Sequence, residues 1–324
     1  MKQPDLDFAE RVREAYERIK PDVRRTPLEY SGPLSRETGA RVFVKWECDQ
    51  HTGSFKLRGA LNKLRSLSEE DRARGVVSAS TGNHGLAIGH ASRLEGVGLK
   101  LFLPETAAEV KRAGIAAMGV DVEVRGASCE KTEAIARGFA ERTGRVFVSP
   151  YNDWDIVRGA GTVGLELADD LGRFDDVLVP VGGGGLIAGV AGFLKAVRPG
   201  VRLVGVEPVT SAFMAASIAA GRLVDIEEKE TVADAVAGGI EPGSITFPLC
   251  RDLVDAIVRV PESRIIQALA LVFRHHGRMV EGAGALPFAA LLEFPRMFGG
   301  RTAVAVVSGA NIAPERFRAV TGLT

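Results

Sequence analysis

The sequence predicts an α/β protein whose parallel β-sheets are covered by helices. The main observation is that short apolar segments rich in β-branched residues alternate with segments of helical periodicity along nearly the whole chain. Repeated strand and helix units favour parallel sheets, because each crossover helix covers a face of the sheet. The length of 324 residues predicts two domains, at roughly 150 residues per domain. No linker rich in serine and proline separates two halves.

The first predicted element is an amphipathic helix near the N-terminus, where Phe8, Val12, Ala15, Tyr16 and Ile19 recur at helical spacing. Nine strands follow, predicted at residues 42–46, 76–79, 99–103, 120–124, 146–149, 177–181, 203–206, 256–260 and 303–307. Helical segments fill the intervals between these strands.

Composition excludes several classes of function. Lys plus Arg and Asp plus Glu each number 41, so the net charge is zero and neither nucleic acid nor an anionic membrane is an expected partner. The uncharged residues 177–194 include Pro180 and six glycines, which predicts buried strand, loop and helix instead of a membrane span. The charged N-terminus lacks the apolar run of a signal peptide. We therefore expect a cytoplasmic protein.

The three cysteines, Cys48, Cys129 and Cys250, support the same location. They are odd in number and widely spaced, and no two of them form a C-x-x-C pair. Neither a disulfide framework nor a zinc site is predicted from such spacing.

The strongest local motif is residues 177–197, which read VLVPVGGGGLIAGVAGFLKAV. A strand, a glycine loop and a helix N-terminus together form an anion cradle, because backbone N–H groups can converge on a phosphate. Gly183, Gly185 and Ala188 also fit a dinucleotide fingerprint, with Glu207 at the end of the next strand. A purely structural glycine loop is the remaining alternative.

A second motif surrounds Lys56, which lies between Phe55 and Leu57 in residues 51–64. Apolar neighbours can lower the pKa of a lysine, and Schiff-base chemistry with an aldehyde requires a neutral amine. The alternative is an ordinary solvated lysine, because most lysines are solvated.

Two further motifs follow predicted strands. Residues 80–85 read Ser-Thr-Gly-Asn-His-Gly before a helical segment, and a helix N-terminus rich in polar donors suits a carboxylate. His84 alone is more often a structural histidine than a base. Ser308 follows the last predicted strand, at the end where α/β sheets place ligand-binding groups.

In combination these motifs resemble the fold-type II pyridoxal-phosphate enzymes, in the branch of threonine and serine dehydratases (ammonia-lyases) and serine racemase. The resemblance covers nearly the whole chain and rests on residues 26–28, 44–47, 50–60, 80–84, 182–186, 205–208, 281–285 and 308–311. It implies a fold similar to the tryptophan synthase β subunit, with two doubly wound domains. Residues 1–67 and 151–324 would form the large cofactor-binding domain, and the inserted residues 68–150 the small domain. A homo-oligomer, dimer or tetramer, is expected.

The resemblance also implies roles for individual residues. Lys56 would be the Schiff-base lysine for pyridoxal 5'-phosphate, Phe55 would face the pyridine ring, and Asn83 would bond its phenolic oxygen. Ser308 would face the ring nitrogen. The phosphate would be held by Gly182, Gly183, Gly184, Gly185 and Leu186. The amino-acid substrate would be bound by Ser80, Thr81, Gly82, Asn83 and His84.

The implied reaction is elimination from an L-β-hydroxy amino acid, giving a 2-keto acid and ammonia. Lys56 would act as general base at the Cα proton. Because a serine hydroxyl is not an acid, Ser308 would leave the ring nitrogen unprotonated, which favours elimination over transamination. Thr81 would be the second catalytic residue. It lies where racemases of this branch carry a serine, and its branched Cβ disfavours racemisation.

No metal site is predicted. The segment after Glu207 lacks the aspartate that helps to bind a divalent cation in some relatives. The adjacent His275 and His276 would diverge by about 100° on a helix, which predicts surface or packing roles.

The identity of the substrate stays open. Thr81 and residues 233–240 are expected to shape its pocket, and threonine, serine, hydroxyaspartate or another hydroxy amino acid would fit. A racemase, a nicotinamide-dependent oxidoreductase built on the glycine loop, and a non-catalytic ligand sensor are the alternative functions.

Overall fold

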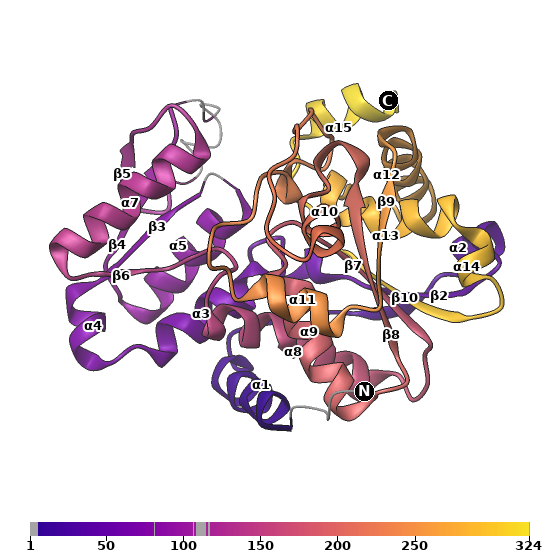
Figure 1. Ribbon diagram of the computed structural model, residues 1–324, viewed down its shortest axis with the longest axis horizontal. Helices are drawn as coiled ribbons and strands as arrows, with labels where there is room; N and C mark the ends of the chain where they lie inside the picture. Colours follow the sequence, from indigo (N-terminus) through magenta and orange to yellow (C-terminus); the bar gives the residue numbers. More distant parts are fainter. Residues whose placement is uncertain (1–5, 81, 106, 108–114, 116, 324) are drawn as a thin grey trace.

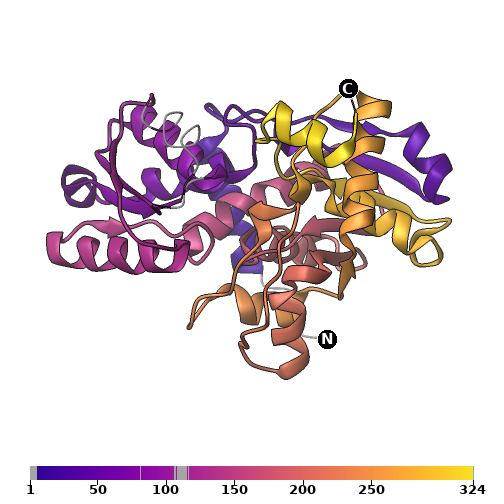
Figure 2. The ribbon, with the colours of Figure 1, turned by 90° about the horizontal axis from the view of Figure 1, so that it is seen from above.

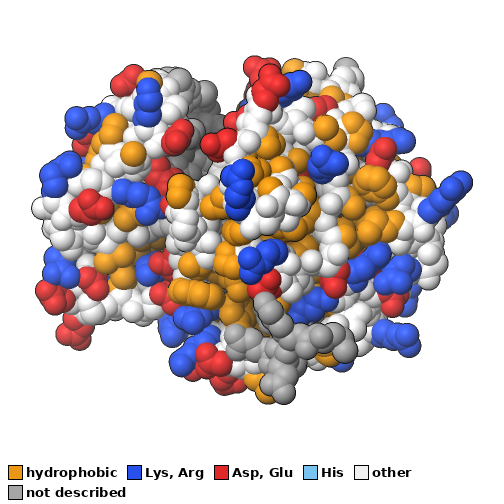
Figure 3. Space-filling view, viewed as in Figure 1, with side chains coloured by type: hydrophobic (Ala, Val, Ile, Leu, Met, Phe, Trp, Pro, Cys, Tyr) orange, Lys and Arg blue, Asp and Glu red, His pale blue; other side chains and the backbone are white. Residues whose placement is uncertain are grey.

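The computed structural model folds into two lobes of unequal size (Figures 1 and 2). It describes residues 6–80, 82–105, 107, 115 and 117–323. The small lobe is a four-stranded sheet with the helices packed on it, and the large lobe holds a six-stranded sheet. Figure 3 shows a surface hollowed between the lobes, with charged side chains of both signs interspersed.

The strands and helices alternate along the chain as expected for an α/β protein. The strands are β1 Leu28–Tyr30, β2 Arg41–Lys45, β3 Val76–Ala79, β4 Leu99–Leu103, β5 Asp121–Val124, β6 Val146–Phe147, β7 Asp176–Pro180, β8 Arg202–Pro208, β9 Ala256–Val260 and β10 Thr302–Val306. The helices are α1 Leu6–Ile19, α2 Gly32–Thr38, α3 Lys56–Ser66, α4 Glu69–Arg74, α5 Asn83–Glu95, α7 Cys129–Thr143, α8 Trp154–Asp170, α9 Gly185–Val197, α10 Phe213–Ala220, α11 Thr246–Leu253, α12 Glu262–His276, α13 Gly282–Glu293, α14 Pro295–Phe298 and α15 Pro314–Thr321.

The large sheet has the order β1-β2-β10-β7-β8-β9. All of its neighbouring strands are parallel except for β1, which pairs antiparallel with β2 at the edge. The last strand of the chain, β10, therefore lies between β2 and β7. This order brings the segments that follow β2, β7 and β10 to one end of the sheet.

Alternate residues of the large sheet enter two different hydrophobic cores. Ala303 and Ala305 of β10 belong to the core that contains α12 and α13. Val304 and Val306 of the same strand belong to the core that contains α1, α8 and α9. Because both faces are covered, the strands consist almost entirely of apolar residues. Figures 1 and 2 show these helices on opposite sides of the strands.

The small sheet has the order β5-β4-β3-β6 with all its strands parallel. Val76 and Leu101 pack into a core shared with α3 and α5, which ties this sheet to the large lobe. Val77 and Phe102 pack on the other face, against Ala136 and Ala140 of α7, among others. The small lobe is thus also doubly wound.

The fold class predicted from the sequence is confirmed, and so are the first helix and all nine predicted strands, with ends displaced by up to two residues. The strand β1 was missed. Strand β6 is shorter than the predicted residues 146–149, ending at Phe147. All four strands of the small sheet fall within residues 68–150, while the domain boundaries themselves stay a prediction. Within the described part of the chain, no helix has both the length and the apolar composition needed to cross a bilayer.

Candidate active site

Lys56 is the first residue of α3 and lies next to the segment that follows β10. Ser54 and Gly309 form an antiparallel bridge, and the amide of Phe55 donates to the carbonyl oxygen of Ser308 at 3.0 Å. The amide of Ala310 donates to the carbonyl oxygen of Gly53 at 2.9 Å. These bonds fix the start of α3 against the end of the central strand, so Lys56 and the buried Ser308 lie in one region.

The side chain of Lys56 is partly buried, and within the described part of the chain its amine has one hydrogen-bond partner. Its Nζ donates to the carbonyl oxygen of Pro150 at 2.7 Å and lies 5.1 Å from the centre of the Phe55 ring. Burial lowers the pKa of Lys56 to about 8, and the negative charge of Glu281 offsets part of this effect. A substantial fraction of this amine is therefore neutral near physiological pH, as a nucleophile or base requires.

Asn83, the first residue of α5, joins the small lobe to the same region. Its Nδ2 donates to Oε1 of Glu281 at 2.6 Å, and its Oδ1 accepts from Nδ2 of Asn311 at 2.6 Å. Asn311 also donates to the carbonyl oxygen of Thr52 at 2.9 Å. This chain of hydrogen bonds holds the N-terminus of α5 near the Lys56 segment.

The glycine loop, residues 182–185, connects β7 to α9. Gly184 adopts a left-handed conformation with φ of 84°, which favours glycine, and the helix that begins at Gly185 has no side-chain cap. A Cβ on Gly183 would lie 2.5 Å from the ring of Tyr151, and a Cβ on Gly182 would lie 2.8 Å from the carbonyl oxygen of Val236. The first N–H groups of α9 lack an intrahelical acceptor, and the glycines themselves place no side chain over them. This arrangement fits an anion such as phosphate.

Tyr151 connects the glycine loop to Lys56. Its ring lies against the position where Gly183 would carry a Cβ, and its Cβ and backbone lie against that of Gly185. The preceding residue, Pro150, supplies the carbonyl oxygen that accepts from Lys56. The anion cradle and the reactive amine are therefore both held by residues 150 and 151.

The N-terminus of α5 is the second helix start in the site. Gly82 is its cap residue and offers no side chain, while the amide of Gly82 donates to Oγ of Ser80 at 3.3 Å. The first amides of this helix therefore suit a carboxylate. Thr81, predicted to be catalytic, lies outside the described residues.

His84 is buried and has a defined tautomer. The hydroxyl of Ser78 donates to the carbonyl oxygen of Val148 at 2.8 Å, so at the 3.0 Å contact with His84 this hydroxyl accepts and Nε2 of His84 donates. Burial, followed by the positive charge of Lys56, lowers the pKa of His84 to about 3. Its Nδ1 is a buried acceptor with no hydrogen-bond partner among the described residues. The neutral imidazole has no free N–H for a carboxylate, so any carboxylate contact of His84 would use its backbone amide.

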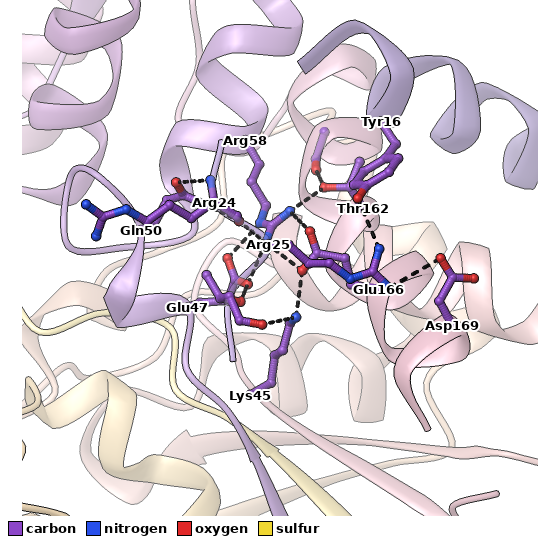
Figure 4. A network of polar contacts seen from close by, with 12 residues as sticks. Tyr16, Arg24, Arg25, Lys45, Glu47, Gln50, Arg58, Thr162, Glu166 and Asp169 are labelled. Atoms are coloured by element: carbon purple, nitrogen blue, oxygen red, sulfur yellow. Dashed lines mark hydrogen bonds and ion pairs between the residues drawn. The ribbon is translucent and has the colours of Figure 1, made fainter. Parts of the chain in front are cut away.

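A buried ion network supports the first turn of α3 (Figure 4). Arg58 donates to Glu47, which follows β2, and to Glu166 of α8, with its Nη1 2.7 Å from Oε1 of Glu166. Lys45 of β2 donates to the other oxygen of Glu166 at 2.6 Å. All four side chains are fully buried. Their charges cancel, and Thr26 and Thr162 complete the hydrogen bonding.

Two features of the sequence have structural roles away from the site. Glu207 caps α10, since its two oxygens accept from the amides of Met214 and Ala215 at 2.9 and 2.8 Å. It is therefore not free for a nucleotide ribose, and burial raises its pKa to about 7. His276 packs on Trp46, and its Nε2 lies 2.9 Å from Oγ of Ser31, which confirms a packing role; His275 is exposed. The described residues contain no cluster of three or more potential metal ligands.

The structure brings together most of the residues that the sequence singled out. A backbone hydrogen bond joins Phe55 to Ser308. The charge of Glu281, which accepts from Asn83, raises the pKa of Lys56. Four other residues of the site have no role predicted from the sequence: Pro150, Tyr151, Glu281 and Asn311. The polar cluster Ser-Pro-Tyr-Asn-Asp after a predicted strand was a signal for the first two.

The comparisons with known proteins agree with this chemistry. Residues 19–309 match the family model described as pyridoxal-phosphate dependent enzyme. The L-threonine ammonia-lyase of Thermotoga maritima is 40% identical over 94% of this chain and 75% of its own length. The processed threonine deaminase isoform 2 of Solanum lycopersicum superposes with a TM-score of 0.92, at 32% identity over 99% of this chain and 95% of that one. Maize serine racemase superposes with a TM-score of 0.91, at 34% identity over 95% and 94% of the two chains.

Proposed function

The chain belongs to the family of pyridoxal-phosphate dependent enzymes, and on this premise we propose that it is a lyase that converts an L-β-hydroxy amino acid to a 2-keto acid and ammonia. Threonine is the first candidate substrate and serine the second. Relatives named threonine ammonia-lyase or dehydratase, at 36–40% identity over more than nine tenths of the chain, support this choice. The observation that carries the proposal is the Lys56 amine, with its lowered pKa, next to a glycine loop at an uncapped helix start.

The residues present fit the cofactor. The free amides at the start of α9, the glycine loop from Gly182 to Gly185, and Leu186 would hold the phosphate. Lys56 would hold the carbonyl carbon, with Phe55 against the ring. Asn83 would bond the phenolic oxygen, and the buried Ser308 would face the ring nitrogen.

When bound, pyridoxal phosphate supplies an electrophilic aldehyde and a ring that withdraws electrons from the amino-acid Cα. Lys56 carries the proton transfer. Its Nζ, neutral in a substantial fraction near pH 7 to 8, accepts the Cα proton of the substrate. The carbonyl oxygen of Pro150 orients this amine and stabilises its protonated form.

The remaining residues of the site orient the substrate. The uncapped start of α5, formed by Gly82, Asn83 and the backbone of His84, would bind the carboxylate, with Ser80 and Thr81 beside it. The negative charge of Glu281 raises the pKa of the Lys56 amine and so offsets part of the lowering caused by burial.

The remaining parts of the proposal concern the whole molecule. We place the domain boundaries at residues 67/68 and 150/151, which the strand content of the small sheet supports. We propose a cytoplasmic location, which the odd number and wide spacing of the cysteines support. The protein would act as a homodimer or tetramer on a small amino acid, with neither nucleic acid nor membrane as a partner.

The first experiment identifies the reactive lysine. The purified protein should show a visible absorption band that borohydride removes, and peptide mapping after reduction should find the cofactor on Lys56. Lys56→Ala should abolish both the band and turnover, whereas Lys20→Ala, which removes an exposed lysine of the N-terminal region, should change neither. An adduct on another lysine would overturn the assignment.

The second experiment identifies the reaction. Release of 2-keto acid and ammonia is measured with L-threonine and with L-serine, and the residual substrate is analysed for its configuration. The likeness to maize serine racemase makes racemisation the specific alternative. Keto acid should form faster than the opposite enantiomer accumulates; the reverse order would identify a racemase.

A further inference from the structure

The chain between η3 (Asp234–Val236) and α11 belongs to the large lobe and contacts the small one. We call residues 237–245 the bridging segment. Figure 1 shows it, in orange, running along the side of the large lobe that faces the small lobe. The segment includes Gly238 and Gly243, both with positive φ, so its path is set mainly by its contacts and not by regular structure.

The contact with the small lobe is an ion pair between Arg137 of α7 and Glu241 of the bridging segment. Two further contacts orient Arg137 toward this partner. Its guanidinium also binds Glu133, one turn earlier on the same helix, at 2.7 and 3.0 Å, and lies 4.1 Å from the centre of the Phe147 ring in β6. The Glu241 side chain is 18% exposed, so the pair is only partly screened by solvent.

Glu241 also fixes Tyr151. Its backbone amide donates to the Tyr151 hydroxyl at 2.8 Å, and its carboxylate lies 3.4 Å from Oγ of Ser149. The Tyr151 ring in turn lies against Gly183 of the glycine loop, and the Cβ and backbone of Tyr151 lie against Gly185. One residue of the bridging segment therefore binds both the small lobe and the aromatic ring that covers the anion cradle.

Two further contacts lie where the bridging segment joins α11, and one of them is to the glycine loop. The amide of Ile245 donates to Oδ1 of Asn152 at 2.9 Å, and the hydroxyl of Thr246 donates to the carbonyl oxygen of Gly183 at 2.6 Å. Gly183 is thus held by Tyr151 on its Cα side and by Thr246 at its carbonyl. Both contacts depend on where the bridging segment lies.

We propose that Arg137 and Glu241 are positioning residues, because their ion pair ties the bridging segment to the small lobe. Through Tyr151 and Thr246 the bridging segment sets the geometry of the glycine loop. This geometry determines the affinity of the loop for a phosphate-bearing cofactor. The inference rests on the proposed function in taking pyridoxal phosphate as that cofactor. It predicts that the position of the small lobe and the affinity for phosphate are energetically coupled.

The test is a double-mutant cycle on the full-length protein with Arg137→Gln, Glu241→Gln and the double variant. The first readout is the dissociation constant of pyridoxal phosphate for the apo protein, from absorbance titration. Each single variant should bind about five- to tenfold more weakly, and the double variant should bind no more weakly than either single one, because both changes remove the same interaction. Arg137→Lys, which keeps the charge, should restore part of the affinity.

The second readout is hydrogen exchange in the apo protein, which does not depend on activity. The amide of Glu241 should exchange faster in both single variants, while the amides of α7 and of the small sheet keep their protection. Arg142→Gln, which removes another arginine of α7, is the matched control and should leave both readouts unchanged. Glu133→Gln should have a smaller effect than Glu241→Gln, because it leaves the contact between the lobes in place.

Additive losses of affinity, or an unchanged dissociation constant in the single variants, would overturn the proposal. Faster exchange throughout the small lobe would also overturn it, since the pair would then be a general structural support. A protein that binds pyridoxal phosphate as predicted but releases no keto acid would refute the proposed reaction and leave this inference standing. A protein that does not bind the cofactor would refute both.

Discussion

Arg58 and Glu47 form a parallel pair of hydrogen bonds: Nε of the guanidinium is 2.7 Å from Oε2 of the carboxylate, and Nη2 is 2.8 Å from Oε1, with neither side chain exposed. Burial alone would raise the pKa of Glu47, but the charge and hydrogen bonds of Arg58 outweigh it and the pKa lies below its usual value. Because Arg58 also binds Glu166, it joins three parts of the large lobe at the turn that carries Lys56.

The first prediction concerns removal of this arginine. Arg58→Leu leaves Glu47 and Glu166 buried with too little positive charge, and we expect a loss of about 3–5 kcal/mol in unfolding free energy. Urea unfolding of the apo protein measures it. Arg316→Leu, which breaks the exposed pair with Asp234, should cost much less. Equal losses of unfolding free energy in the two variants would show that the buried network stabilises the protein no more than the exposed pair does.

The second prediction concerns the pH dependence of stability. Burial lowers the pKa of Lys56 from 10.5 to about 8 in the folded protein, with partial compensation by Glu281. Between these values the unfolded chain binds a proton that the folded chain does not, so the Lys56 contribution to stability rises with pH across that window. Lys56→Met should therefore make the apo protein more stable at pH 7, and this advantage should shrink from about pH 8 to 10.5. A constant difference in unfolding free energy over that range would contradict the lowered pKa.

The third prediction concerns Glu281. Its negative charge raises the pKa of Lys56, so Glu281→Gln should move the midpoint of Lys56 labelling by an amine-reactive reagent to lower pH. Peptide mapping of the labelled apo protein gives the midpoint. Glu293→Gln removes a carboxylate that pairs with Arg264 on the surface and should leave the midpoint unchanged.

The fourth prediction concerns the glycine loop. In Gly183→Ala the new methyl group would lie 2.5 Å from the Tyr151 ring, so the ring or the loop must move. Overpacking of this kind costs about 1–3 kcal/mol, and we expect it to appear mainly as weaker binding of pyridoxal phosphate. Gly172→Ala, where the added carbon meets nothing within 4 Å, is the control. If both variants bind the cofactor like the wild type, the loop does not form the phosphate site.

The fifth prediction concerns metal removal. Both oxygens of Glu207 accept from backbone amides, so this carboxylate near the end of β8 is already engaged as a helix cap. A chelator should therefore leave the rate of keto-acid release nearly unchanged. Loss of activity with the chelator, reversed by a divalent cation, would show that another group of ligands binds a metal.

The sequence predicted the strands well because the buried parallel strands are continuous apolar runs bounded by polar or glycine residues. It missed β1 because Leu28-Glu29-Tyr30 is short, lies at the sheet edge and is stabilised by antiparallel pairing with β2, which leaves no periodic signal. The glycine loop was also predictable, since few other roles require consecutive glycines between a strand and a helix.

Other parts of the site have no sequence signature. The partner of Lys56 is the backbone carbonyl of Pro150, and any residue there offers a carbonyl oxygen. Glu207 fitted a nucleotide-binding pattern by position, but its environment makes it a cap for α10. The tautomer of His84 depends on the acceptor of the Ser78 hydroxyl proton. That acceptor, the carbonyl oxygen of Val148, is set by the packing of β3 against the segment after β6. The roles of the site residues toward cofactor and substrate stay predictions.

The central place of β10 in the large sheet has a consequence for synthesis of the chain on the ribosome. Its neighbours β2 and β7 are made long before it and have no common partner until Thr302–Val306 leaves the exit tunnel. The small sheet, whose four strands are complete by residue 147, can form earlier. The bonds of residues 53–55 to residues 308–310 form only after β10 has been made, so Lys56 gains its supported position late. The large sheet therefore closes through contacts of high sequence separation, which are slow to form.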